Sequence, residues 1–112
     1  MSGASAQRRG ADPAPVFAAL GDRTRLALLR RLSDGQTRSI ATLSEDTALT
    51  RQAVTKHLHV LEHAGLVSSV RVGRESRFAY RPEPVQDMRA YLAGISARWD
   101  ETLSRLRDFV ES

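Results

Sequence analysis

Residues 50 to 81 read TRQAVTKHLHVLEHAGLVSSVRVGRESRFAYR, and this stretch decides the fold. Its first part places Val54, Leu58 and Leu61 four and three residues apart, which is the spacing of a buried stripe on an α-helix. Gly65 then ends the helix, and two runs rich in β-branched and aromatic residues follow on either side of a short glycine turn. The stretch therefore predicts a helix followed directly by a β-hairpin.

The helix face opposite the apolar stripe is polar and basic. Arg51 and Gln52 suit base edges, because a guanidinium can bind guanine O6 and N7 together and a carboxamide can bind adenine N6 and N7. Thr50, at the positive end of the helix, is better placed for a phosphate. An ordinary solvated helix face would carry similar residues. With that alternative open, the residues expected to contact DNA are Ser39, Thr50, Arg51, Gln52, Thr55, Lys56, His59, Arg71, Arg74 and Arg77.

The hairpin is expected to turn near residues 73 to 75. The residues expected on its inner side are Val70, Val72, Phe78 and Tyr80. This arrangement leaves Arg71, Arg74 and Arg77 at the tip and on the outer side, where they can meet phosphates or a narrow minor groove. Edge strands also carry charge simply to avoid aggregation. The position directly after a recognition-type helix favours DNA.

Two helices are expected before this region. A short apolar face in residues 16 to 20 predicts the first, which Gly21 ends. Asp22 suits the N-cap of the second, whose core leucines recur at helical spacing. These are Leu26, Leu29 and Leu32. Gly35 supplies the left-handed residue that commonly stops a helix.

Residues 39 to 64 predict a helix-turn-helix. Ser39 is a candidate cap for a short third helix with Ile40, Ala41 and Leu43 inward. A turn of residues 46 to 49 follows, and Thr50 caps the next helix. Such turns often hold a glycine where Ala48 stands here. Alanine in a left-handed conformation costs about 1 kcal/mol, too little to exclude the motif.

Residues 84 to 110 predict one long helix, with Pro82 and Pro84 suited to its start. Its apolar residues follow a seven-residue pattern broken only by Thr102. A domain of this size cannot cover so long a stripe, which predicts a twofold partner, most simply a second copy. The alternative is a helix folded back onto its own core. The interface is expected to contain Val16, Phe17, Leu20, Met88, Tyr91, Leu92, Ile95, Trp99, Leu103 and Leu106.

Composition fits a nucleic-acid partner without requiring one. The chain has 112 residues, with 17 Lys and Arg against 13 Asp and Glu. Residues 50 to 81 hold six of the basic residues and only two of the acidic ones, which places positive charge on the helix and hairpin. A basic surface that serves only solubility is the alternative. The chain has no cysteine, which excludes disulfides and thiolate sites. No signal peptide or membrane span is recognisable, so we expect a cytoplasmic protein.

Four runs of the sequence, FAALGDRTRLALLRRL, LTRQAVTKHLHVLEHAGLV, RVGRESRFAY and WDETLSRLRDFVE, follow one another in the chain. Together they resemble the ArsR/SmtB family of bacterial winged-helix repressors, over about residues 15 to 111. The resemblance implies a homodimeric repressor whose terminal helices form the interface and whose fourth helix enters the major groove of a pseudo-palindromic operator. It assigns base and phosphate contacts to Thr50, Arg51, Gln52, Thr55 and Lys56, wing contacts to Arg74 and Arg77, and a structural role to His57.

Departures from the family bear on what the chain senses. Metal-binding members use a Cys-x-Cys pair on the third helix, and Ser44 and Asp46 stand at the matching positions. Neither is a soft thiolate ligand. The other familiar site uses histidines of the last helix, yet no histidine follows His63. The chain therefore resembles the metal-independent branch. We expect no metal site and no cofactor, and the identity or existence of an effector stays open.

A zinc-peptidase motif is also present. His59, Glu62 and His63 spell H-x-x-E-H, the inverted zinc signature. Catalytic zinc needs a third ligand and a cleft with an open coordination position, whereas His59 lies on the proposed DNA face. Weak zinc binding by His59 and His63 is an alternative that the sequence does not decide. No nucleophile elbow or phosphate-binding loop accompanies it, so we expect no enzyme.

The fold expected is mainly α with a small β-hairpin, a winged helix-turn-helix of four helices, a hairpin and a fifth helix. Its parts are a flexible arm (1–12) and one domain (13–112), which contains the helix-turn-helix (39–64), the wing (66–81) and the dimerisation helix (84–110). The expected partners are double-stranded DNA and a second copy of the chain, with no membrane, in a bacterial cytoplasm and at the nucleoid when bound. The alternative is a winged-helix protein-interaction module without specific DNA binding. Such a module predicts an acidic or apolar recognition face, against which Arg51, Gln52 and Lys56 argue.

Overall fold

The computed structural model describes residues 12–45 and 47–112, so the expected flexible arm lies outside the described residues except for Asp12. The elements follow the order helix, helix, strand, helix, helix, strand, strand, helix. They are α2 (Ala14–Leu20), α3 (Arg23–Leu32), β1 (Arg38–Ser39), α4 (Ile40–Glu45), α5 (Arg51–His63), β2 (Val67–Val72), β3 (Glu75–Tyr80) and α6 (Glu83–Glu111). The expected mainly helical fold with a hairpin between the last two helices is confirmed.

The core lies where α3, α4 and α5 meet the inner face of the sheet. Its fully buried side chains are Leu28, Leu32, Leu43, Val54, Leu58, Leu61, Leu66 and Val67, joined by Ala19, Leu29 and Phe78. The stripe predicted on α5 is therefore buried. Leu26 was expected in the core, but it is 46% exposed. Its place is taken by Leu28, because the buried face of α3 runs through Leu28, Leu29 and Leu32.

The sheet has three antiparallel strands in the order β1, β3, β2. Strand β1 was not expected from the sequence, since it consists only of Arg38 and Ser39, which pair with Phe78 and Arg77. Two polar residues carry no alternation of apolar and polar side chains. The short strand exists because the loop between α3 and α4 runs along the free edge of β3. The hairpin is thereby fastened to the helix-turn-helix on one side.

The register of the hairpin corrects the expected inner face. Ser69 stands opposite Phe78 and Val70 stands opposite Arg77, and directly opposed residues point to the same side of a sheet. Val70 and Val72 therefore share a face with Arg77, and Val72 is 49% exposed. The buried residue of β2 is Val67. The error has a simple cause: Val67 and Val70 are three positions apart, so they point to opposite faces.

Three turns have the glycine conformation that the sequence predicts. Gly35, Gly65 and Gly73 have φ of 86°, 79° and 65°, in the left-handed region that L side chains avoid. At Gly73 the positive φ of the first turn residue and the two-residue loop match a type II′ hairpin turn. No other described residue type has a positive φ. The strain expected at Ala48 is therefore absent, and residues 47–49 of the turn before α5 contain no left-handed conformation.

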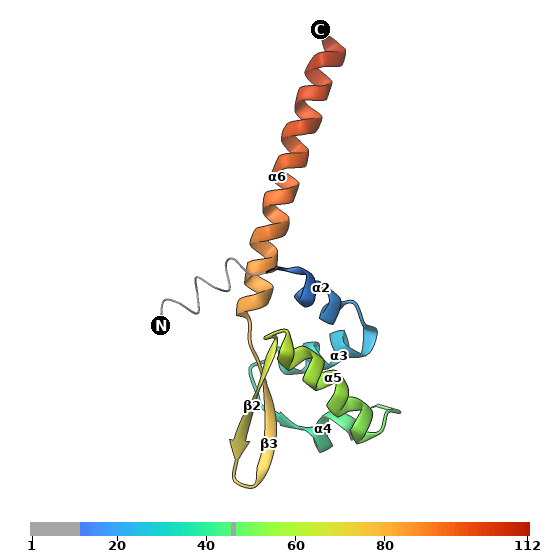
Figure 1. The fold of residues 1–112 in the computed structure, drawn as a ribbon, viewed down its shortest axis with the longest axis vertical. Coiled ribbons are helices and arrows are strands. Elements are labelled where there is room, and N and C mark those ends of the chain that lie inside the picture. The colour runs from blue at the N-terminus through green and yellow to red at the C-terminus, as the bar shows by residue number, and fades with distance from the viewer. Residues whose placement is uncertain (1–11, 46) are drawn as a thin grey trace.

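Helix α6 leaves the body of the protein and continues alone, while the β2–β3 hairpin projects at the opposite end (Figure 1). At 1.5 Å per residue its 29 residues span about 43 Å. Its first turns pack beside α2, where the rings of Phe17 and Tyr91 lie 6.3 Å apart. All residues after Ile95 are exposed. The second half of α6 is therefore left uncovered by the described residues of its own chain.

Candidate nucleic-acid interface

The predicted recognition helix begins at a well-formed cap. Thr50 has an extended backbone, and its hydroxyl oxygen accepts a hydrogen bond from the amide of Ala53 at 3.1 Å. This is the arrangement that satisfies an otherwise unpaired amide of the first turn. The hydroxyl proton stays available to a phosphate. The predicted cap is confirmed, and Asp22 caps α3 in the same way through the amide of Arg25.

The outer face of α5 presents four exposed polar or basic side chains. They are Arg51, Gln52, Lys56 and His59. Thr55 lies among them, half-buried, and donates from its hydroxyl to the carbonyl oxygen of Arg51 at 2.7 Å. In the part of the chain that the structure describes, neither Arg51 nor Lys56 forms an ion pair. Their positive charge is therefore open to a ligand along one face of the helix.

Ser39 does not join this face. It is only 6% exposed, and its hydroxyl accepts from the amide of Thr42 and donates to the Thr42 hydroxyl, both at 3.1 Å. Ser39 thus caps the short helix α4, as its type predicts. A buried hydroxyl with both roles filled has no means to contact DNA. We therefore withdraw the expectation of a DNA contact at Ser39.

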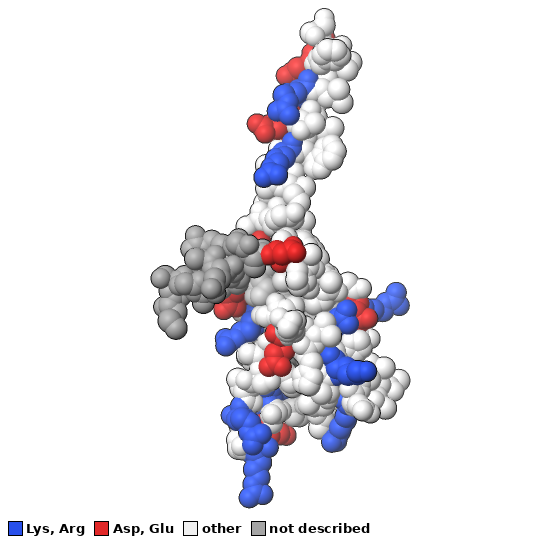
Figure 2. Space-filling view, viewed as in Figure 1, with Lys and Arg blue, Asp and Glu red and all other residues white. Residues whose placement is uncertain are grey.

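The wing arginines divide between two faces, which corrects the expectation that all three lie at the tip or on the outer side. Arg71 stands opposite Ser76 and so shares the face of Phe78. Arg77 lies on the opposite face. Arg71 and Arg74 are exposed, and basic side chains stand out at the hairpin end of the molecule (Figure 2). Arg77 is half-buried on the other face of the sheet, where its Nε donates to Glu75 at 2.9 Å and its Nη1 to Thr37 at 3.5 Å. Arg71 and Arg74 are hence free to meet phosphates, whereas Arg77 helps to hold the wing to the loop before β1.

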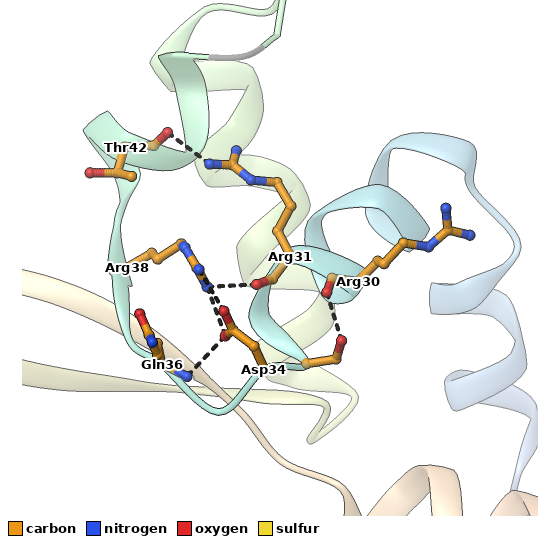
Figure 3. Close-up of polar contacts among 7 residues, drawn as sticks. Arg30, Arg31, Asp34, Gln36, Arg38 and Thr42 are labelled. Atoms are coloured by element: carbon orange, nitrogen blue, oxygen red, sulfur yellow. Dashed lines mark hydrogen bonds and ion pairs between the residues drawn. The ribbon is translucent and has the colours of Figure 1, made fainter.

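A polar cluster that the sequence did not reveal holds the first helix of the helix-turn-helix (Figure 3). Arg38 binds the Asp34 carboxylate with both terminal nitrogens, at 3.0 and 2.7 Å, and donates to the carbonyl of Arg31 at 2.6 Å. Arg31 in turn donates to the carbonyls of Leu43 and Thr42 in α4. Hydrogen bonds from Arg38 lower the pKa of Asp34 to about 2. The cluster therefore joins the end of α3 to β1 and α4.

The residues expected at a dimer interface differ in how much surface they offer. Tyr91, Leu92, Trp99, Leu103 and Leu106 are between 48% and 61% exposed. Val16, Phe17, Leu20, Met88 and Ile95 are half-buried, and Val16 and Leu20 already pack on the core. Phe109 and Val110, at the end of the same stripe, are 79% and 74% exposed. Phe109 fits the seven-residue pattern and Val110 widens the same stripe, so this pattern was the signal that could have added both to the expected interface.

No group of three or more His, Cys, Asp or Glu side chains in residues 12–45 and 47–112 could hold a metal ion. Of the zinc-like motif, His59 and His63 are exposed. The carboxylate of Glu62 accepts a hydrogen bond from the hydroxyl of Ser69 at 2.8 Å. Glu62 therefore links the end of α5 to the wing. None of the described helices has a stretch apolar and long enough to span a bilayer.

Comparison with known proteins assigns this arrangement to a family. A family model described as a helix-turn-helix domain matches residues 20–70. The chain is 42% identical over 82 residues to the HTH-type transcriptional regulator YuzN of Bacillus subtilis, covering 65% of this chain and 86% of YuzN. An ArsR-like transcriptional regulator from Rhodococcus superposes with a TM-score of 0.78 at 38% identity, over 87% of this chain and 91% of that one. The chain belongs to the ArsR family.

This ArsR-family protein is thus a DNA-binding transcriptional regulator with a winged helix-turn-helix, in which α4 and α5 form the helix-turn-helix and the β2–β3 hairpin forms the wing. A further similar structure is the winged helix-turn-helix domain of Mb0332 from Mycobacterium bovis, described as homodimeric. Its TM-score is 0.60 at 25% identity, over 75% of this chain and 77% of that one. The two curated relatives with significant similarity are both HTH-type transcriptional regulators.

Proposed function

We propose that this regulator is a dimeric repressor that binds a pseudo-palindromic operator. In this arrangement α5 lies in the major groove and the wing reaches the adjacent backbone. The observation that carries the proposal is the outer face of α5, where Arg51, Gln52 and Lys56 are exposed. Arginine and glutamine can each bind a purine through two hydrogen bonds. A lysine acts as a point charge and suits a phosphate.

The second half of α6 supports the dimer. Trp99, Leu103 and Leu106 are more than half exposed on a helix that its own chain leaves uncovered. Large contiguous apolar surfaces of this kind mark interaction sites, and closed twofold dimers are the commonest assembly of soluble proteins. The homodimer formed by the Mb0332 domain adds support from a relative with the same fold. The partner proposed for α6 is accordingly a second copy of this chain.

In a twofold dimer, the symmetry of the protein determines how the operator is recognised. Its two α5 helices enter successive major grooves on one side of the duplex, about 34 to 36 Å apart, so the operator mirrors the symmetry of the protein. Repression follows when the bound dimer occludes a promoter. No metal or cofactor is part of this proposal, because Ser44 and Asp46 replace the thiolate pair of metal-sensing relatives and neither supplies a soft ligand.

The test separates base reading from backbone attraction. A duplex selected from a random library with the wild-type protein serves as the operator, and random DNA of equal length is the comparison. Arg51→Ala or Gln52→Ala should cost about 1 to 3 kcal/mol on the operator and relax preference at one base position. Arg74→Ala should weaken binding to both duplexes alike.

Arg107→Ala serves as a matched control, since it removes the same charge from an exposed position near the far end of α6. It should leave both affinities nearly unchanged. Equal losses on operator and random DNA for Arg51→Ala would contradict its assignment as a base-reading residue. A wild-type protein that selects no sequence would instead favour a winged-helix module that binds another protein.

A further inference from the structure

Three helices meet at the side chain of Arg25, which lies in the first turn of α3. Its Nε donates to the carbonyl oxygen of Ala19 at 2.7 Å, and its Nη2 donates to that of Ala18 at 3.3 Å. The guanidinium thereby closes the carboxyl end of α2. Its Nη1 lies 3.4 Å from Nδ1 of His57, on α5. One half-buried side chain of α3 thus contacts both α2 and α5.

Asp22 lies beside this contact and fixes the backbone of Arg25. Its carboxylate accepts a hydrogen bond from the amide of Arg25 at 3.0 Å, and its Oδ2 lies 3.8 Å from Nδ1 of His57. The carboxylate can pair with His57 only when Nδ1 carries a proton, and Nδ1 then cannot accept from Arg25. The hydrogen bond from the Arg25 amide is the main cause that lowers the pKa of Asp22. The carboxylate is therefore charged at neutral pH beside the guanidinium. We name Asp22, Arg25 and His57 the helix joint.

The chemistry of the joint depends on the shape of arginine. A guanidinium only donates, so its contact with His57 requires Nδ1 to be unprotonated and to accept. Arginine holds five N–H groups in one rigid plane and can serve several acceptors in fixed directions, whereas a lysine ammonium is a compact point charge. A cation at the end of α2 also stabilises the negative end of that helix dipole. Lysine at position 25 would keep the charge but lose the geometry.

Direct packing between α2 and α5 is interrupted beside the joint. A groove of about 460 Å³ lies between the two helices. It is lined by Pro15, Ala18, Ala19, Arg25, His59, Val60, His63 and Ala64. Small side chains such as Ala18 and Ala64 leave this space unfilled. Contact across the groove is therefore small, and the position of α2 relative to α5 depends on the joint together with the packing of α2 on the core through Ala19, which is 1% exposed.

We propose that Arg25 is a positioning residue that fixes the recognition helix relative to the dimer interface. Helix α2 carries the proposed interface residues Val16, Phe17 and Leu20, and α5 carries the DNA-reading residues. Through Arg25 the position of α2 determines the position of α5. It therefore also determines the spacing of the two α5 helices in the dimer. This inference rests on the proposed dimeric function and adds the residue that sets its geometry.

The experiment compares Arg25→Lys with the wild type on three kinds of duplex. These are the selected operator, the same operator with one half-site scrambled, and operators with one base pair inserted or removed between half-sites. Arg25→Lys should weaken binding to the intact operator about tenfold, equivalent to ~1.4 kcal/mol, and leave single half-site affinity within about twofold. Arg25→Lys should also reduce the preference for one half-site spacing over the others. A purely structural role of Arg25 would leave that preference unchanged. Arg30→Lys, at an exposed position on the same helix, is the matched control.

A second pair of variants tests the same contact from His57, so the test does not depend on whether Arg25→Lys folds. In His57→Asn the side-chain oxygen takes the place of Nδ1 as acceptor, so spacing preference should be retained. In His57→Leu the acceptor is lost, and the preference should flatten. Melting temperature and sedimentation check that each variant is folded and dimeric.

The outcomes separate this inference from the proposed function. Folded, dimeric Arg25→Lys and His57→Leu variants with wild-type affinity and wild-type spacing preference would overturn the positioning role. So would equal losses on the intact and half-scrambled operators. Failure of the wild-type protein to select any duplex, or its binding as a monomer, would instead overturn the proposed dimeric repressor on which the inference rests.

Discussion

Trp99 offers the sharpest perturbation of the proposed dimer. It is 61% exposed in one chain, and a tryptophan buries about 150 to 250 Å² when fully covered. The part still exposed therefore amounts to about 90 to 150 Å². At about 25 cal/mol per Å² its burial contributes about 2 to 4 kcal/mol per protomer, and twice that in a twofold dimer. If the partner covers only half of this surface, Trp99→Ala still raises the dimer Kd at least about thirty-fold.

Sedimentation equilibrium over a range of protein concentrations measures that Kd directly. Trp99 is the only tryptophan of the chain, so its fluorescence in the wild type reports the same event without a label. Emission should move to shorter wavelength as concentration rises and water leaves the ring. Ser104→Ala, at an exposed position on the other side of α6, is the control and should leave dimerisation unchanged. A Trp99→Ala dimer as tight as the wild type would show that Trp99 is not buried in the interface.

Three further predictions concern stability. Thr50→Ala removes the hydrogen bond to the amide of Ala53 and should lower the free energy of unfolding by about 1 kcal/mol, measured by urea denaturation; an unchanged midpoint would show that the cap contributes nothing. Leu58→Ala empties a fully buried site and should cost about 2 to 5 kcal/mol in the same assay, so a loss below ~1 kcal/mol would contradict the core position. The pKa of Asp34 is lowered from 3.8 to about 2, so its contribution is complete above pH 3.8 and disappears as the pH falls toward 2; Asp34→Asn should remove this part of the acid dependence, and identical acid profiles of variant and wild type would argue against it.

Local signals in the sequence predicted most of the helix-turn-helix and wing. Asp22 and Thr50 were expected as caps, and both accept the amide hydrogen bond that defines one. Gly35 and Gly65 end helices with positive φ. These features depend on a few neighbouring residues, since a cap or a left-handed stop is decided within one helical turn. The local sequence was therefore sufficient to predict these helix caps and helix ends.

Features decided by distant parts of the chain were missed or wrong. The register of the hairpin depends on which residue of β2 meets the core, and the apolar run of Val70 and Val72 pointed to the wrong face. Leu26 has the helical spacing of a core residue, yet the buried face of α3 runs through Leu28, Leu29 and Leu32, and Leu26 is 46% exposed. Strand β1 exists only because β3 has a free edge beside it. Each of these outcomes depends on tertiary packing that a periodicity cannot encode.

The candidate DNA-binding site also combines features that local sequence predicts with features that depend on tertiary packing. The exposed face of α5 follows from its helical period, because the buried stripe fixes which residues point outward. The joint of Asp22, Arg25 and His57 does not, since 32 positions separate Arg25 from His57. Ser39 illustrates a further limit. One residue type suits both a cap and a phosphate contact, and only its burial decides between them.

The number of chains bound per operator duplex distinguishes a dimeric repressor from a monomeric DNA-binding protein. A labelled operator duplex, held well above its Kd, is titrated with the wild-type protein while fluorescence anisotropy is recorded. We predict a break at two chains per duplex, and, in titrations below Kd, an affinity whose logarithm falls linearly with the logarithm of the salt concentration. A break at one chain per duplex, or no binding at low salt, would contradict a dimer that reads DNA through two recognition helices.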